Sequence, residues 1–414
     1  MKDIKLHTRC KLIDKYRKIP LLVFFLLFSI PPIFIGLFNS SSYAEGIIVF
    51  DLLFLVYALS NLKRKIDLNY KKKYIGIAII LIFSFIFCHS AYIMLVLDYP
   101  FNLTKFFVTY IGLIITFLSA WFFGNIIITQ SEESINKIVL FLIFFFILNI
   151  LFSYIGLNLG DGWSPVGLFQ EPSHVAIFLA PLLIYSSRKK LKGNIVYLLV
   201  FLFWGAIGKN LTIILVVVFS SLFYIVKLRD FILSIVLFIF LGILTLPFMD
   251  TEYFTSRINL SSDTTSGSSL VFLKGWDNAI ESFTVTDGVG IGYQQLGYSS
   301  VLKNNGSAFQ ALSILNLEEL NKYDGGSVSP KIIAEFGVFG IFFILLYVIG
   351  FIQLILNLKN KEKRSGVVFL QCCYLGLFFE LFFRGAGYFT IGTFLFIAAV
   401  TNLKFSINSS NKFK

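Results

Sequence analysis

The sequence predicts an all-α integral membrane protein with about twelve transmembrane helices, and three observations lead to this prediction. Hydrophobic residues make up 57% of the 414 residues, and only 14% are charged, whereas an ordinary soluble domain is about a quarter charged. Apolar runs near the length of about 20 residues that a bilayer crossing needs recur along the chain. Basic residues gather in the short segments between alternate runs. The composition excludes a soluble globular enzyme.

Each apolar run is expected to be a helix, because backbone polar groups facing lipid must be satisfied within their own segment. The sixth to eighth runs are the shortest, so the number of crossings is least certain there. The expected spans are 20–38, 46–62, 74–97, 106–128, 137–157, 173–187, 194–208, 211–226, 231–249, 330–356, 366–383 and 386–403.

The placement of basic residues predicts the orientation. If the N-terminus is cytoplasmic, all but eight of the 35 Lys and Arg residues fall in cytoplasmic segments or at their edges, as the positive-inside rule requires. The net charge of +12 therefore reports topology rather than nucleic-acid binding, and both termini are expected in the cytoplasm. The eight outer-side cations are Lys105, Lys209, Arg257, Lys274, Lys303, Lys322, Lys331 and Arg384.

One long connection divides the chain. Residues 1–249 hold the first nine spans, 250–329 form a large outer loop, and 330–414 hold the last three spans and a cytoplasmic tail. Loops of this length are usually functional. Within the loop, 308–322 has leucines at helical spacing, which predicts an amphipathic helix on the membrane or across a cleft.

Glu171 and His174 lie at the outer mouth of the sixth span. Pro172 suits the first position of a helix, so the two side chains are three residues apart and can share a face. A carboxylate beside an imidazole is a plausible acid–base pair. The alternative is a helix-capping Glu171 and an interfacial His174.

Several outer-side cations are candidates for binding a diphosphate. Arg384 lies in a glycine-flanked turn, where Glu380 one turn earlier is its expected partner. Lys331 follows the start signal of the tenth span, with Glu335 one turn further in. Cations that converge on one cleft would suit a diphosphate, although snorkelling and solvation are the alternatives for each of them. The remaining candidates are Lys209, Arg257 and Lys274.

Other chemistry has little support in the sequence. Gly288–Gly292 lacks the third glycine of the dinucleotide fingerprint, so a loop or a close backbone approach is expected there. The four cysteines show no paired spacing, and we expect neither a disulfide framework nor a metal site from them. No nucleotide-binding loop or nucleophile elbow is present.

The chain resembles the O-antigen polymerase (Wzy) family, which is related to the O-antigen ligases (WaaL-like) of the GT-C type. The resemblance covers the number of spans, the late outer loop and three stretches: 167–174, Trp276 to 292, and 325–337. Ligases usually carry a catalytic His at the end of the large loop, but 325–330 has none, which favours a polymerase. Lys274 stands near the place where ligase-like proteins often carry an Arg.

The resemblance implies a reaction at the periplasmic face of a Gram-negative inner membrane. The growing glycan would move from undecaprenyl diphosphate onto the next lipid-linked repeat unit, without a metal or other cofactor. A base must take the proton of the attacking hydroxyl, and cations must stabilise the leaving diphosphate. Glu171 is the expected base and His174 its partner or a phosphate ligand. A chain-length regulator is a further implied partner.

Two rival functions stay open. A ligase would pass the glycan to another acceptor, the lipid A core. A flippase or other transporter should carry ionisable groups along a central path and have similar halves, whereas here the ionisable groups cluster at the outer mouths and the large loop is one-sided.

Overall fold

The computed structural model describes residues 19–38, 42–61, 71–159, 166–223, 250–258, 261, 263–264, 266–303, 305–356 and 364–403. Regular secondary structure in these residues is helical. The helices are α2 (Ile19–Phe38), α3 (Ala44–Asn61), α4 (Lys71–Leu95), α5 (Leu103–Ile128), α6 (Glu132–Tyr154), α7 (Pro172–Lys189), α8 (Asn194–Ile207), α9 (Leu211–Leu222), α11 (Thr251–Ile258), α12 (Gly267–Val285), α13 (Ser307–Ile314), α14 (Val328–Leu356), α15 (Ser365–Phe382) and α16 (Ile391–Asn402).

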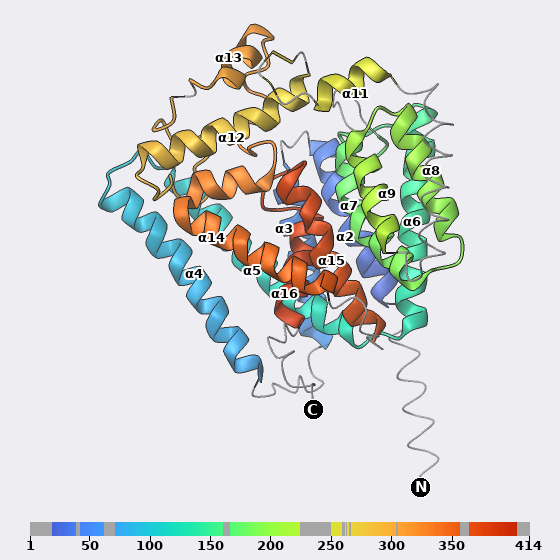
Figure 1. Cartoon of the computed structure of the whole chain (residues 1–414). Coiled ribbons are helices and arrows are strands. Elements are labelled where there is room, and N and C mark those ends of the chain that lie inside the picture. Colours follow the sequence, from blue (N-terminus) through green and yellow to red (C-terminus); the bar gives the residue numbers. More distant parts are fainter. Residues whose placement is uncertain are drawn as a thin grey trace, which may run out of the picture.

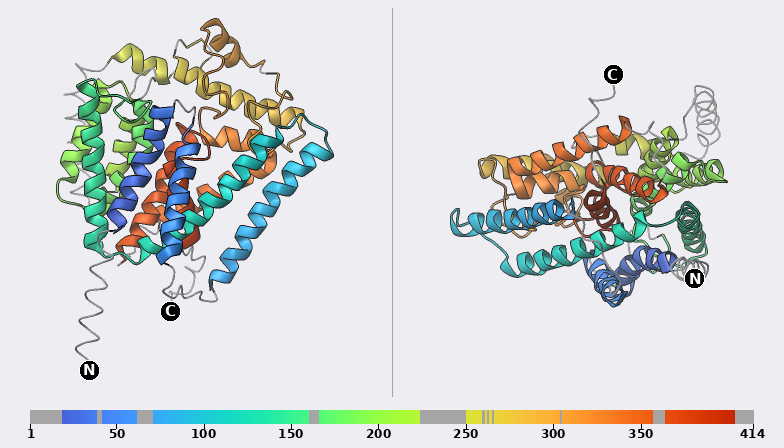
Figure 2. Two further views of the ribbon diagram at one scale, coloured as in Figure 1. Left: turned by 180° about the vertical axis from the view of Figure 1, so that it is seen from behind. Right: turned by 90° about the horizontal axis from the view of Figure 1, so that it is seen from below.

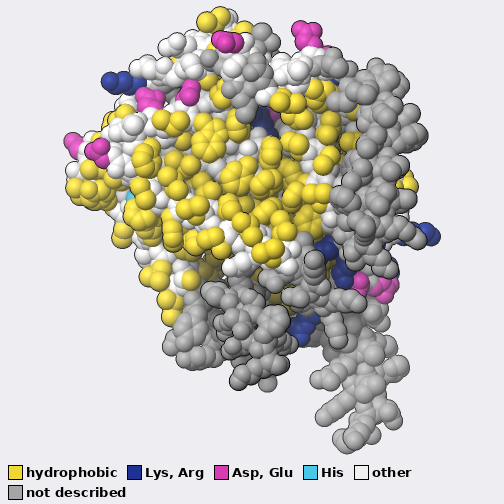
Figure 3. Space-filling model, viewed as in Figure 1, with side chains coloured by type: hydrophobic (Ala, Val, Ile, Leu, Met, Phe, Trp, Pro, Cys, Tyr) yellow, Lys and Arg dark blue, Asp and Glu magenta, His cyan; other side chains and the backbone are white. Residues whose placement is uncertain are grey.

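The protein is a multi-pass membrane protein. Among the described residues, six helices are long and apolar enough to cross a bilayer: α2, α4, α5, α6, α14 and α15. On the face drawn in Figure 3, hydrophobic side chains form a broad belt, and charged side chains gather above and below it. The expectation of an all-α membrane protein is thus confirmed.

The number of twelve crossings stays a prediction. Helices α8, α9 and α16 have 14, 12 and 12 residues, fewer than the roughly 20 that a straight crossing needs. The final helix begins at Ile391 and not near 386 as expected, because Thr390 caps it by accepting from the Thr393 N–H (3.0 Å). The expected span 231–249 and both chain termini lie outside the described residues.

Helices α7 and α15 form the centre of the bundle. Every residue of α7 from His174 to Ser187 is buried, and α15 is the most buried of the six candidate crossings. The two helices pack closely, because a Cβ on Gly376 would meet Pro181 at about 3.0 Å. By contrast α4 lies at the edge of the bundle (Figure 2), and α14 is likewise largely exposed.

The described part of the large outer loop forms a helical cap. Helices α11, α12 and α13 lie over one end of the bundle (Figure 1). The expected helix 308–322 was wrong in length, because α13 ends at Ile314 and left-handed Asn316 and Asn321 break the segment that follows. Its leucines Leu312 and Leu320 pack on α12 rather than on lipid.

The glycine-rich segment 288–292 packs on α14, as expected for a close backbone approach. Gly290 has a φ of +91°, and a Cβ there would meet the Glu335 carbonyl oxygen at 2.6 Å. The N–H groups of Ile291 and Gly292 donate to the carbonyls of Ala334 (3.0 Å) and Glu335 (2.9 Å). These bonds fix the cap to the start of α14, just before the kink at Gly337.

Candidate functional site

A tight turn before α7 sets the position of Glu171. Val166 and Phe169 exchange backbone hydrogen bonds of 2.8 and 3.0 Å. The Asn149 amide of α6 holds the same turn, donating to the Val166 carbonyl (2.8 Å) and accepting from the Leu168 N–H (2.7 Å). Gly167 is required here, since its φ is +59° and a Cβ would collide with Asn149. The turn delivers the chain to Pro172, the first residue of α7.

Glu171 pairs with Arg384. The Nη2 atom of Arg384 donates to both carboxylate oxygens of Glu171, at 2.9 and 2.7 Å. The Arg384 side chain is 11% exposed and that of Glu171 is 33% exposed. The carboxylate therefore remains accessible, although the guanidinium is almost covered. Residues 213 positions apart in the sequence form this ion pair.

The loop after α15 and the outer cap together hold Arg384. The backbone N–H of Arg384 donates to the Phe379 carbonyl (2.9 Å). The backbone N–H of Gly385 donates to the Gly326 carbonyl (3.0 Å). When the amide of the cap residue Asn321 is oriented so that both its oxygen and its nitrogen have hydrogen-bond partners, its oxygen accepts from Nη1 (3.0 Å) and Nη2 (3.1 Å) of Arg384. The Nε atom is buried without a partner.

The ion pair sets the charge of Glu171. Burial alone would raise the pKa of this carboxyl, but Arg384, with smaller contributions from His174 and a hydrogen bond from Ser173 Oγ (3.0 Å), lowers it from 4.5 to about 2. Glu171 is therefore an anion at neutral pH. Arg384 neutralises this charge and partly blocks the carboxylate from accepting a proton.

The imidazole of His174 bonds to Tyr43 rather than to the Glu171 carboxylate, although the His174 backbone N–H donates to the Glu171 carbonyl (3.1 Å). Its Nδ1 atom lies 2.9 Å from the Tyr43 hydroxyl, and the two rings meet edge to face with centroids 5.2 Å apart. Both residues are buried, at 6% and 2% exposure. We call Glu171, Arg384, His174, Tyr43 and Arg257 the Glu171 centre.

Arg257 reaches the Glu171 centre from helix α11. Burial lowers the pKa of the Arg257 guanidinium. The positive charge of Arg384 lowers this pKa further, whereas the negative charge of Glu171 raises it. The charges of both residues therefore act on Arg257. Its guanidinium lies 4.8 Å from the centroid of the Tyr253 ring, an attractive cation–π distance.

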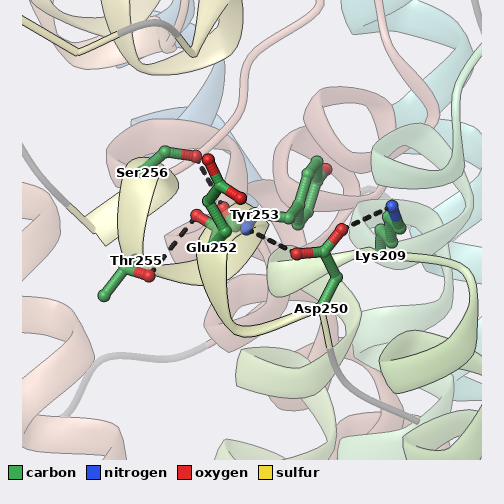
Figure 4. Close-up of polar contacts among 6 residues, drawn as sticks. All are labelled: Lys209, Asp250, Glu252, Tyr253, Thr255 and Ser256. Atoms are coloured by element: carbon green, nitrogen blue, oxygen red, sulfur yellow. Dashed lines mark hydrogen bonds and ion pairs between the residues drawn. The ribbon is translucent and has the colours of Figure 1, made fainter.

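Lys209 holds α11 in place at the surface. Figure 4 shows its Nζ paired with Asp250, at 2.7 Å. The other carboxylate oxygen of Asp250 accepts from the Tyr253 N–H (2.9 Å), and so starts α11. Lys209 also lies 5.6 Å from the Tyr253 ring centroid. The contacts of Lys209 are thus with Asp250 and Tyr253, rather than with Glu171.

Lys331 and Lys274 donate hydrogen bonds to residues of the outer cap. Buried Lys331 donates to the Tyr323 carbonyl (2.6 Å) and to Gln294 Oε1 (3.3 Å). Lys274, also buried, donates to the Glu318 carbonyl and lies over the Phe309 ring. Glu335 does not bond to Lys331 but accepts from the N–H groups of Gln294 and Leu296. These contacts join the loops of the cap to α12 and α14.

The expected pairing of Glu380 with Arg384 was wrong. Glu380 is fully buried and accepts from the Thr390 hydroxyl at 2.6 Å. The chain turns after Phe382, where α15 ends, so Arg384 no longer follows the helical spacing on which the expectation rested. Its partner is Glu171.

Three contributors to the site escaped the sequence argument: Tyr43, Tyr253 and Asn321. No motif distinguishes Tyr43 and Tyr253 among 19 tyrosines. Asn321 gave one unused signal, since asparagine in a glycine-rich segment is prone to the left-handed conformation that it adopts, with a φ of 50°. Within the described residues, no group of three or more His, Cys, Asp or Glu could hold a metal ion.

The chain matches no protein-family model, and the comparisons with curated proteins and with solved structures likewise found no match.

Proposed function

We propose that the protein is a surface-polysaccharide polymerase of the O-antigen polymerase type, with a GT-C-like arrangement of about twelve spans. It acts at the periplasmic face of a bacterial inner membrane. Its donor and acceptor are oligosaccharides linked to undecaprenyl diphosphate. The observation that carries the proposal is the contact of Glu171 with Arg384, where an accessible carboxylate and an almost covered cation meet.

Glu171 is the base in this proposal. The acceptor hydroxyl oxygen attacks the anomeric carbon of the donor glycan, and its proton passes to Glu171. The bond from that carbon to the phosphate oxygen breaks, and undecaprenyl diphosphate leaves with the electron pair. The donor is already activated, so the reaction needs no nucleotide on the outer side of the membrane.

Arg384 is the first ligand of the leaving diphosphate, and Arg257 the second. A diphosphate competes with Glu171 for the Arg384 guanidinium, because both offer oxygens suited to its planar donors. Once Arg384 turns to the diphosphate, Glu171 loses the cation that holds its pKa near 2 and becomes a stronger base. Donor binding and base activation are thereby linked.

Lys209, Lys331 and Lys274 have a supporting part in this proposal. Their contacts hold α11, α12 and the loops of the cap in position. The cap covers the bound glycan, and its Asn321 orients Arg384. A chain-length regulator remains a proposed partner.

The ligase is the nearer alternative function, and it differs only in the acceptor. The absence of a histidine in 325–330, at the end of the cap, favours the polymerase. Recovery of the glycan on lipid A core, and not on undecaprenyl diphosphate, would establish the ligase.

The substitution Glu171→Gln tests the proposal in cells. It keeps the size of the side chain and removes its basicity, so we expect polymer formation to fall by about 10²–10⁴-fold, the usual contribution of a general base. The control is Glu132→Gln, which changes an exposed carboxylate paired with Lys189 at the far end of α7. Normal long-chain polymer from Glu171→Gln, at normal membrane levels, refutes the assignment of the base.

A further inference from the structure

The contact between Tyr43 and His174 is the least explained part of the Glu171 centre. Tyr43 lies in the segment before α3, and His174 lies in the first turn of α7. The Tyr43 ring also packs edge to face on Phe178, with centroids 5.3 Å apart. Aromatic packing therefore fixes the hydroxyl at His174 Nδ1, 2.9 Å away.

The direction of this hydrogen bond follows from what each group can do. The large majority of buried hydroxyl groups are hydrogen-bonded, and a phenol has one proton to donate. Among the contacts of the described residues, the partner of the Tyr43 hydroxyl is His174 Nδ1. Burial and the nearby Glu171 carboxylate raise the pKa of Tyr43, so the phenol keeps its proton. The hydroxyl donates, and Nδ1 accepts.

The charge of His174 follows from its surroundings. A nitrogen that accepts a hydrogen bond carries no proton, so the proton of the neutral ring is on Nε2. A second proton would place an imidazolium at a buried position near the Arg384 guanidinium. The nearby carboxylate that would favour that charge is Glu171, and it is already paired with Arg384.

We propose that Tyr43 is a positioning residue that holds His174 in the neutral Nε2–H form, so that His174 is a hydrogen-bond donor to a phosphate oxygen and not a base. The identity of the ligand rests on the proposed function; the hydrogen-bond assignment does not. The inference decides between the two roles that the sequence left open for His174, and it leaves Glu171 as the single base of the centre.

Nitrogen NMR tests the tautomer directly, because the chain has only three histidines. In the full-length protein labelled with ¹⁵N-histidine, the spectrum of His174→Gln identifies the His174 signals by their loss. His89 provides an internal reference for an Nε2–H tautomer, since its Nε2 lies 3.0 Å from the Val289 carbonyl oxygen. At neutral pH we expect a bare Nδ1 and a protonated Nε2 for His174. A protonated Nδ1 overturns the proposal.

Two matched variants separate positioning from packing. Tyr43→Phe keeps the ring and removes the hydroxyl, and we expect His174 to become a mixture of both tautomers. Tyr185→Phe removes a buried hydroxyl from α7 that bonds to Asn136 (2.8 Å), and its His174 signals should match those of the wild type. A Tyr43→Phe spectrum identical to the wild type overturns the proposal.

Inorganic pyrophosphate tests the ligand. We expect its addition to shift the His174 Nε2 signal in the wild type, and no movement of that signal overturns the donor role toward phosphate. The spectra require no turnover. A protein with the expected tautomer that formed no polymer would therefore remove the proposed reaction and leave the Tyr43–His174 assignment standing.

Discussion

Glu171 and Arg384 restrain each other in the resting protein. A carboxylate whose pKa is about 2 is a weak base, and a guanidinium bound to it is not free for another anion. The pair is also two-thirds or more covered on both sides, so water only partly screens it. The proposed reaction therefore requires the pair to open, and we infer that a competing anion opens it.

We expect activity to fall with every substitution that removes the planar donors of Arg384. Arg384→Ala removes the proposed diphosphate ligand, and we expect a loss of about 10²–10³-fold in turnover, as for other electrostatic stabilisers. Arg384→Lys keeps the charge but cannot bind both carboxylate oxygens in the same way, so we expect intermediate activity. The measurement is polymer yield per membrane-embedded protein. Equal activity of the two variants would remove Arg384 from the site.

The pH dependence of stability has a defined sign. The pKa of Glu171 is lowered in the folded state, so the pair stabilises the fold fully above about pH 4.5, and this contribution disappears as the pH falls towards about 2. We therefore expect the thermal stability difference between wild type and Glu171→Gln to be constant from neutral pH to about 5. It should shrink below that. A difference that instead changes between pH 6 and 8 contradicts the assignment.

The sequence located Glu171 but could not locate its partner. Pro172 predicted the start of a helix and thus the exposed place of Glu171, because this rule is local. The pairing of Arg384 depends on where the chain turns after α15 and on the packing of α15 against α7. Such contacts between distant segments carry no periodic signal.

Helix α11 carries Arg257 of the Glu171 centre, and Asp250 directly before the helix holds Lys209 at the protein surface. The charges of Glu171 and Arg384 act on Arg257, whereas Lys209 is half exposed and paired with Asp250. We expect Arg257→Ala to reduce polymerisation by about 10- to 150-fold, since a hydrogen bond to a charged group is worth about 1.5–3 kcal/mol. Lys209→Ala should change activity much less, because exposed ion pairs contribute little. Polymer yield of the two variants is the test, and a larger loss for Lys209→Ala would reverse these roles.

The elements were predictable where one pattern dominated. The long apolar runs gave α2, α5, α6 and α14 within a few residues of their ends. Helix α12 was not expected, because its sequence mixes Gly, Ser and charged residues with the apolar ones that pack inside the cap. Its burial depends on Leu312 of α13 and on the 325–326 glycines, which only the folded cap brings against it.

At the scale of the whole molecule, the two ends of the helical bundle differ in charge and in the elements that cover them. Glu171 directly precedes α7, and the basic pair Arg188 and Lys189 ends it, which separates them by roughly 25 Å at 1.5 Å per residue. The outer cap reaches the Glu171 end, because Asn321 of the cap contacts Arg384, the partner of Glu171. The positive-inside rule assigns the basic end to the cytoplasm, so we infer that the Glu171 centre faces the opposite side.

The most direct test is an assay with the purified full-length protein in bilayer nanodiscs. The substrate is the undecaprenyl-diphosphate-linked repeat unit, with no ion gradient and no nucleotide. The account predicts longer lipid-linked chains, one undecaprenyl diphosphate released for each chain transferred, and neither product from Glu171→Gln. Repeat units that stay unjoined in the presence of folded wild-type protein would contradict it and would favour the transporter.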